Sequence, residues 1–136
     1  MSRRGAREVA LKTLFVLDFT PDSEVDSAIT TARENIGGLS NQDMEFCKQL
    51  IVGTKAKQEE IDLALGKLSK EWQLSRMGAI DRNLLRMAAY EINFAEEKTP
   101  ASVVINEAVE LAKIYGTDES AGFVNGILGA LVRDHE

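Results

Sequence analysis

The sequence predicts an all-α fold, a compact bundle of six or seven helices. Apolar residues recur at spacings of three and four along most of the chain, and Val and Ile do not follow the alternation that is typical of strands. The 136 residues are 44% hydrophobic and 28% charged, which are ordinary values for a folded globular protein. A chain of this length forms one domain, or at most two small subdomains that share an interface.

The first part of the chain contains three predicted helices. The first covers residues 2–19 and ends before a Thr-Pro pair. The second begins at a capping box formed by Ser23 and Asp26 and ends at a Gly-Gly pair. The third begins at another capping box, formed by Ser40 and Asp43.

Three or four predicted helices follow. Residues 53–57 either separate two helices or bend one, and the apolar stripe continues beyond them to Trp72. Ser75 is the predicted N-cap of a helix that reaches about residue 94. Pro100 suits the start of the next helix, because a proline there sacrifices no needed N–H. Ser120 is the predicted N-cap of the last helix. The chain is thus predicted to be one domain of residues 1–136, with small helical subdomains at about 1–57 and 58–136.

Charge is unevenly distributed along the chain. The formal net charge is −6, but residues 1–12 carry +3 and the remainder carries −9. Arg3, Arg4 and Arg7 are three and four residues apart, so their guanidinium groups can face one side and bind successive phosphates. The spacing alone also fits a solvated, frayed terminus.

Single-stranded RNA binding further requires aromatic side chains beside the basic residues. The candidates are Phe15, Phe19 and Phe123. Each also lies on or near an apolar stripe, so core packing is the favoured interpretation.

The residue inventory argues against several classes of protein. Cys47 is the single cysteine and His135 the single histidine, so neither a Cys/His metal site nor a nucleophile with a histidine base is expected. There is no glycine-rich phosphate loop of the Walker or dinucleotide type. No apolar run approaches the roughly 20 residues that span a bilayer, and no signal peptide is recognisable. A cytoplasmic protein with no cofactor, no metal and no catalytic activity is expected.

Three glycines, Gly122, Gly126 and Gly129, interrupt the strongly apolar last helix. Each costs about 1 kcal/mol relative to alanine in a helix interior, so a compensating interaction is expected. We interpret them as positions where two helices approach closely, in preference to close approach of an RNA backbone.

Four segments resemble the NusB family, and together they extend over nearly the whole chain. They are residues 3–8 (RRGARE), 80–92 (IDRNLLRMAAYEI), 105–113 (INEAVELAK) and 123–128 (FVNGIL). The resemblance implies an all-helical transcription antitermination factor that works in the transcription elongation complex on ribosomal RNA operons. It also implies joint binding of boxA-type single-stranded RNA with NusE, a protein that also serves in the small ribosomal subunit.

The resemblance also implies which residues bind. The basic N-terminal region of the family contacts RNA, and the partner surface of the family involves the middle helix. The RNA-binding residues implied here are Arg3, Arg4, Arg7, Phe15, Phe123 and Ser120. The partner-binding residues implied here are Asp81, Arg82, Tyr90 and Glu91.

Two other function classes stay open at this point. The first is the RNA-binding helical module of an rRNA-methyltransferase-like system, because a similar helical domain precedes certain RNA cytosine methyltransferases. A cofactor-binding α/β sheet is not expected within 136 residues. The second is a purely structural helical dimerisation protein. The apolar stripes are wide enough for either a monomer or a homodimer.

Overall fold

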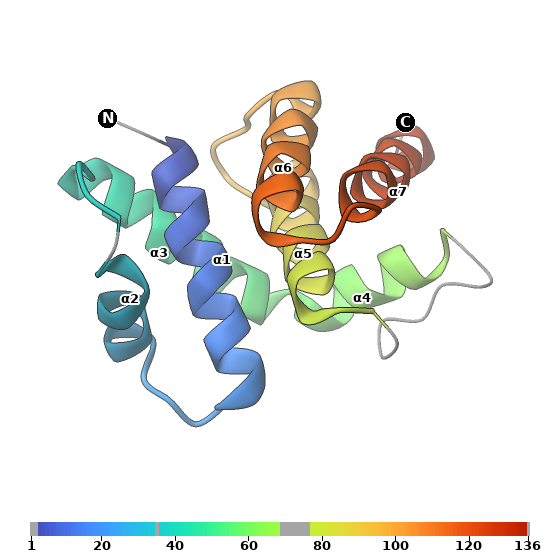
Figure 1. The fold of residues 1–136 in the computed structure, drawn as a ribbon. Coiled ribbons are helices and arrows are strands. Elements are labelled where there is room, and N and C mark those ends of the chain that lie inside the picture. The colour runs from blue at the N-terminus through green and yellow to red at the C-terminus, as the bar shows by residue number, and fades with distance from the viewer. Residues whose placement is uncertain (1–2, 35, 69–76, 136) are drawn as a thin grey trace. The chain divides into compact units, whose positions relative to one another are not determined.

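The structure is a computed structural model that describes residues 3–34, 36–68 and 77–135. All regular secondary structure in these ranges is helical, which confirms the predicted all-α class (Figure 1). The helices are α1 (Arg3–Phe19), α2 (Val25–Arg33), α3 (Asn41–Ala56), α4 (Gln58–Gly66), α5 (Ala79–Asn93), α6 (Ala101–Tyr115) and α7 (Ser120–His135). None of the helices in the described part of the chain has the length and apolar character needed to cross a membrane.

The chain divides into two compact units, Met1–Val52 and Gly53–Glu136, and the boundary lies within α3. The boundary expected from the sequence, near Lys57, lies just after the end of the same helix. Two separate helices are present, but residues 53–56 belong to the first of them and only Lys57 lies between, because α3 continues to Ala56 and α4 begins at Gln58.

The first unit is built around α1, which packs against α2. Buried residues lie around most of the circumference of α1. Small residues are buried in both helices, namely Ala6 and Ala10 of α1 and Ala28 and Ala32 of α2. The first half of α3 adds further core residues, namely Cys47, Leu50 and Ile51. Burial of these apolar side chains supplies most of the stabilisation of the unit.

The second unit consists of α5, α6 and α7, which pack against one another, with α4 packed against α5 (Figure 1). Its core includes Leu65 of α4, Leu84 and Leu85 of α5, Leu111 of α6 and Leu128 of α7. A bidentate ion pair reinforces the α4–α5 contact: Nε and Nη2 of Arg86 lie 2.8 and 3.0 Å from the two carboxylate oxygens of Asp62. Arg86 is therefore held inside the unit and is not a freely solvated side chain.

The capping predictions have different outcomes. The Ser40–Asp43 box is confirmed, because the Asp43 N–H donates to Oγ of Ser40 at 3.0 Å and the Ser40 N–H donates to Oδ2 of Asp43 at 3.1 Å. The Ser23–Asp26 box is wrong: Glu24 is the N-cap of α2, and its side chain makes no capping hydrogen bond. The predicted cap at Ser75 lies outside the described residues.

The glycines of α7 do not mark close packing between helices. A Cβ atom built on Gly122 or Gly126 meets nothing within 4 Å, and both residues are exposed. The expectation of close helix–helix approach is therefore wrong at these two positions. The close approach occurs instead at Gly53, where an added Cβ would collide with the ring of Tyr90.

Candidate nucleic-acid interface

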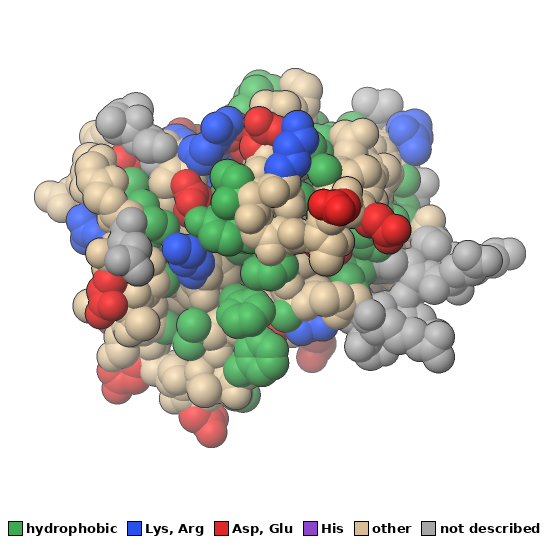
Figure 2. All heavy atoms as spheres, in the orientation of Figure 1, with side chains coloured by type: hydrophobic (Ala, Val, Ile, Leu, Met, Phe, Trp, Pro, Cys, Tyr) green, Lys and Arg blue, Asp and Glu red, His purple; other side chains and the backbone are tan. Residues whose placement is uncertain are grey.

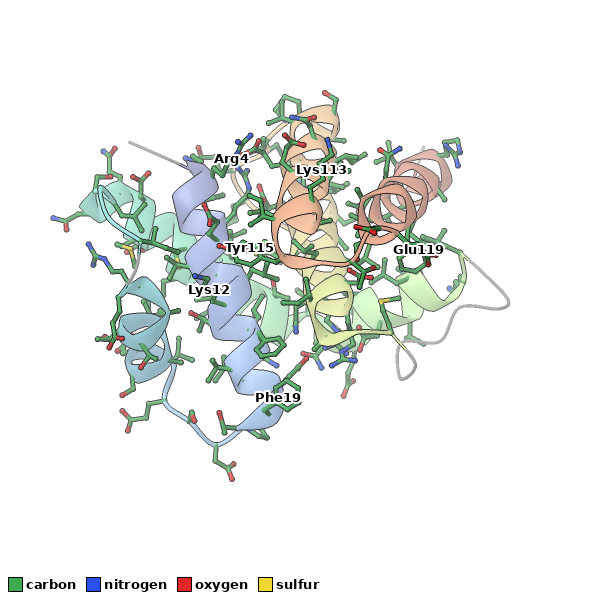
Figure 3. All side chains as sticks on the ribbon, in the orientation of Figure 1. Arg4, Lys12, Phe19, Lys113, Tyr115 and Glu119 are labelled. Atoms are coloured by element: carbon green, nitrogen blue, oxygen red, sulfur yellow. The ribbon has the colours of Figure 1, made fainter. Side chains whose placement is uncertain are left out.

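The exposed face of α1 carries cationic and aromatic side chains in one line. Successive spacings of four, four, three and four residues place Arg4, Glu8, Lys12, Phe15 and Phe19 on the same side of the helix. Figure 3 shows Arg4 in the first turn, Lys12 near the middle and Phe19 at the end of α1. We call these five residues the α1 face.

The three N-terminal arginines have different surroundings although they lie within roughly 100° of the helix circumference. Arg4 is exposed, Arg3 is half-buried, and Arg7 is buried with 4% of its surface accessible. Arg7 belongs to the buried side of α1 because its neighbours at four-residue and seven-residue spacing, Leu11 and Leu14, face the core. The three arginines, which are predicted to hold successive phosphates, thus differ in accessibility, and Arg4 is the exposed one.

The α1 face ends in a pair of aromatic rings. The ring centroids of Phe15 and Phe19 are 4.9 Å apart, with an angle of 55° between the planes. Phe19 is 66% exposed, so the interpretation of this residue as core packing is wrong. In Figure 2 hydrophobic side chains gather on the surface over the C-terminal half of α1. Phe15 is half-buried, as is Phe123 of α7 in the other unit.

Ser120 is buried at the turn between α6 and α7. It is 1% exposed, and its Oγ accepts a hydrogen bond from the Thr117 N–H at 2.9 Å. The assignment of Ser120 as a direct RNA contact is therefore corrected: the hydroxyl closes the turn between α6 and α7. Helix α7 begins at Ser120 itself, so this residue is not its N-cap. The neighbouring Asp118 and Glu119 are exposed, and Figure 3 shows Glu119 at the turn that leads into α7.

The four predicted partner-binding residues occupy both sides of α5. Glu91 is 2% exposed and faces the core, so it is unavailable for direct partner contact. Tyr90 is half-buried with its ring against Gly53 of α3. Asp81 and Arg82 lie in the first turn of α5 and are partly exposed, and Nη1 of Arg82 donates to the carbonyl oxygen of Met77 at 3.1 Å. The N-terminal turn of α5 is thus the accessible part of the predicted surface.

The single cysteine has the environment of a core residue. Cys47 is fully buried in α3, and burial raises the pKa of its thiol from 9.0 to about 11, partly offset by the positive charge of Arg33. At neutral pH the thiol is protonated, which is the unreactive form.

The sequence patterns did not predict two features of the site. One is the exposure of Phe19, which the apolar period of α1 had assigned to the core. The other is Phe46 of α3, whose ring lies beside Arg3 and Arg7. No pattern within α3 marks Phe46, because the contact depends on how α3 packs against α1.

Comparison with known proteins agrees with this architecture. Residues 4–133 match the model of the NusB family. The chain is 48% identical over 132 residues to the transcription antitermination protein NusB of Desulforamulus reducens, covering 97% of this chain and 90% of that protein. It is 37% identical over 134 residues to NusB of Bdellovibrio bacteriovorus, covering 98% of this chain and 97% of that protein.

Solved structures give the same result. NusB of T. maritima superposes with a TM-score of 0.87 at 34% identity, covering 98% of this chain and 92% of the other. A chain from the crystal structure of antitermination factors NusB and NusE in complex with dsRNA superposes with a TM-score of 0.84 at 27% identity, covering 97% and 96%. With a family match over nearly the whole sequence and the same helical fold, this chain belongs to the NusB family.

Proposed function

We propose that this chain is a transcription antitermination factor that binds RNA jointly with a NusE-type ribosomal protein. The observation that carries the proposal is the family match over residues 4–133. Relatives at 37% to 48% identity bear the antitermination name, and one similar structure contains NusB, NusE and dsRNA. These names favour antitermination over a methyltransferase-associated module or a purely structural helical dimerisation protein.

The α1 face is the proposed RNA-binding surface. Arg4 is exposed in the first turn and supplies a guanidinium for phosphate, with Arg3 beside it. Arg7 supports these two from its buried position. Phe15 and Phe19 supply an apolar surface, suited to an unstacked base or to the partner protein, at the far end of the same helix. Phe123 of α7 stays a proposed RNA-binding residue of the second unit.

The first turn of α5 is the proposed dock for the partner. Outside its first twelve residues the chain carries a net charge of −9, which repels RNA. A basic partner bound near Asp81 and Arg82 neutralises part of this charge and adds its own phosphate contacts. Partner and RNA then strengthen each other's binding by the same factor, as linkage requires.

The remaining properties follow from this role. A factor that acts on nascent RNA in the elongation complex works in the bacterial cytoplasm, so we place it there. Binding and assembly are its proposed activities, and we propose no catalytic reaction, metal or cofactor for it. Whether it acts as a monomer or a homodimer is a separate property, which sedimentation of the free protein at several concentrations measures.

A gel-shift assay with boxA-type RNA, with and without NusE, tests the proposal. Both single-stranded and duplex forms of the RNA belong in the assay, because the similar complex contains dsRNA. We expect RNA binding that becomes clearly tighter when NusE is present. Equal RNA affinity with and without NusE contradicts the cooperative scheme, and no RNA binding in either condition contradicts the function.

Charge reversal at the proposed dock sharpens this test. Asp81→Lys is expected to weaken NusE binding and to lower RNA affinity only when NusE is present. Glu96→Lys is the matched control, because it makes the same change of charge at an exposed position in the α5–α6 loop. An Asp81→Lys effect on RNA binding without NusE would instead place Asp81 in the RNA site.

A further inference from the structure

Two of the three N-terminal arginines pack on the same aromatic ring. Cζ of Arg3 lies 4.0 Å from the centroid of the Phe46 ring, and Cζ of Arg7 lies 5.1 Å from it. All three residues belong to the first unit. Phe46 comes from α3, so the contact joins the start of α1 to a different helix.

The ring counteracts an unfavourable placement of charge. The first turn of α1 contains no acidic residue, and positive side chains there are repelled by the positive end of the helix dipole. The face of an aromatic ring is electronegative and attracts a guanidinium within about 6 Å of the centroid. Phe46 thus gives Arg3 and Arg7 a favourable contact that α1 alone does not provide.

Stacking on a ring does not itself use the hydrogen-bond donors of a guanidinium. A guanidinium that packs on a ring uses its flat face, whereas its five N–H donors lie in its plane and point outward. The ring and a phosphate therefore do not compete for the same part of the side chain. The ring also restricts the rotamers of two long side chains before any ligand arrives.

We propose that Phe46 is a positioning residue for RNA binding, one that holds the half-buried Arg3 in the arrangement that phosphate binding uses, with the buried Arg7 packed on the same ring. The inference rests on the RNA-binding function proposed above and assigns to Phe46 no contact with RNA of its own. Ordering a long side chain on binding costs conformational entropy, so a side chain that is ordered beforehand binds more tightly. The N-terminal arginines accordingly comprise two side chains that pack on the Phe46 ring, Arg3 and Arg7, and the exposed Arg4 beside them.

Two substitutions at one position separate the aromatic face from simple packing. Phe46→Leu keeps an apolar side chain and removes the ring, whereas Phe46→Tyr keeps the ring. Phe94→Leu is the matched control, because the Phe94 ring lies 5.6 Å from Nζ of Lys57 in the second unit. The full-length variants are compared in binding boxA-type RNA together with NusE, and their thermal unfolding is recorded in parallel.

We expect Phe46→Leu to weaken RNA binding by about three- to tenfold, the effect of having to order a long arginine side chain on binding. Phe46→Tyr and Phe94→Leu are expected to stay within about twofold of the parent protein. Unchanged affinity in Phe46→Leu, or an equal loss in Phe46→Tyr, would overturn the positioning role while leaving RNA binding by the parent protein intact. A parent protein that binds no RNA would instead remove the proposed function, and this inference with it.

A spectroscopic measurement on the free parent protein tests the geometry independently of any variant's folding. Protons that lie over the face of an aromatic ring resonate upfield. We expect upfield-shifted side-chain resonances for Arg3 and Arg7 and ordinary ones for Arg4. Ordinary resonances for all three arginines would show that the ring does not hold them in solution, and the inference would fail.

Discussion

Arg4 and Arg7 lie one turn apart on α1, yet we expect Arg4 to contribute to RNA binding and Arg7 to contribute to the stability of the fold. Arg4→Ala removes an exposed charge, so we expect RNA affinity to fall and the salt dependence to flatten by roughly 0.7 units for single-stranded RNA, with thermal stability unchanged. Arg7→Ala removes a buried side chain and is expected to lower the free energy of unfolding by about 1–3 kcal/mol. Binding isotherms at several salt concentrations and thermal melts of both variants make the comparison. An Arg7→Ala protein of parental stability with a flattened salt slope would show that Arg7 contacts RNA directly.

Cys47 predicts a specific dependence of stability on pH. The pKa of its thiol is about 11 in the folded protein and 9.0 as its ordinary value, so above pH 9 the unfolded chain loses this proton while the folded chain keeps it. The free energy of unfolding therefore falls as pH rises from 9 to 11, by at most about 1.4 kcal/mol per pH unit, and is unaffected by this group below pH 9.

The matched variant for this prediction is Cys47→Ala. Its stability is expected to decline less steeply than that of the parent protein between pH 9 and 11, as measured by chemical denaturation across that range. RNA binding at neutral pH is expected to be the same for the two proteins. Parallel pH profiles would show that the buried thiol does not titrate differently in the two states.

At the scale of single helices, the two serine caps predicted from the sequence provide a direct comparison. Ser40→Ala removes the hydroxyl that accepts the Asp43 N–H, so we expect a loss of about 1 kcal/mol in the free energy of unfolding. Ser23→Ala is the control, because Ser23 is exposed and α2 has Glu24 as its N-cap. It is expected to change stability by less than about 0.5 kcal/mol. Equal losses in urea denaturation would contradict the observed boundary of α2.

The helix glycines provide a second comparison. Gly126→Ala adds a methyl group in open space on an exposed helical position, so we expect a gain of about 0.5–1 kcal/mol in stability. Gly53→Ala drives a Cβ atom into the ring of Tyr90 and is expected to cost about 1–3 kcal/mol. Thermal unfolding of both variants measures the difference. A destabilised Gly126→Ala protein would mean that another group occupies the space beside α7.

Helix positions could be predicted to a large extent because amphipathic periodicity is a local property. The Ser40–Asp43 box shows this well, since both partners lie within one turn. Whether a polar side chain faces the core or the solvent is harder to predict from the sequence, because it depends on how neighbouring helices pack. Glu91 and Ser120 are polar and were assigned to the surface, but the fold places both inside. The position of Phe46 beside Arg3 likewise exists only once α3 has packed against α1.

At the scale of the whole molecule, the negative charge of the chain opposes RNA binding. Glu119 is exposed at the turn before α7, where a carboxylate interacts favourably with the dipole of that helix but repels an approaching phosphate. We expect Glu119→Gln to change stability by at most about 1 kcal/mol and to tighten RNA binding at low salt, with the gain disappearing at high salt. Titrations at several salt concentrations measure this. Affinity unaffected at every salt concentration would place this turn away from the RNA.

The boundary between the two units lies inside α3, and this affects how the protein can be divided. Val52 and Gly53 are consecutive residues of one continuous helix, so the junction offers proteases no extended segment of the kind they cleave. Splitting the gene there would give two fragments, each with a severed helix end and backbone hydrogen bonds that have lost their partners. Dividing the chain at this boundary would therefore damage both units, although each has a core of its own.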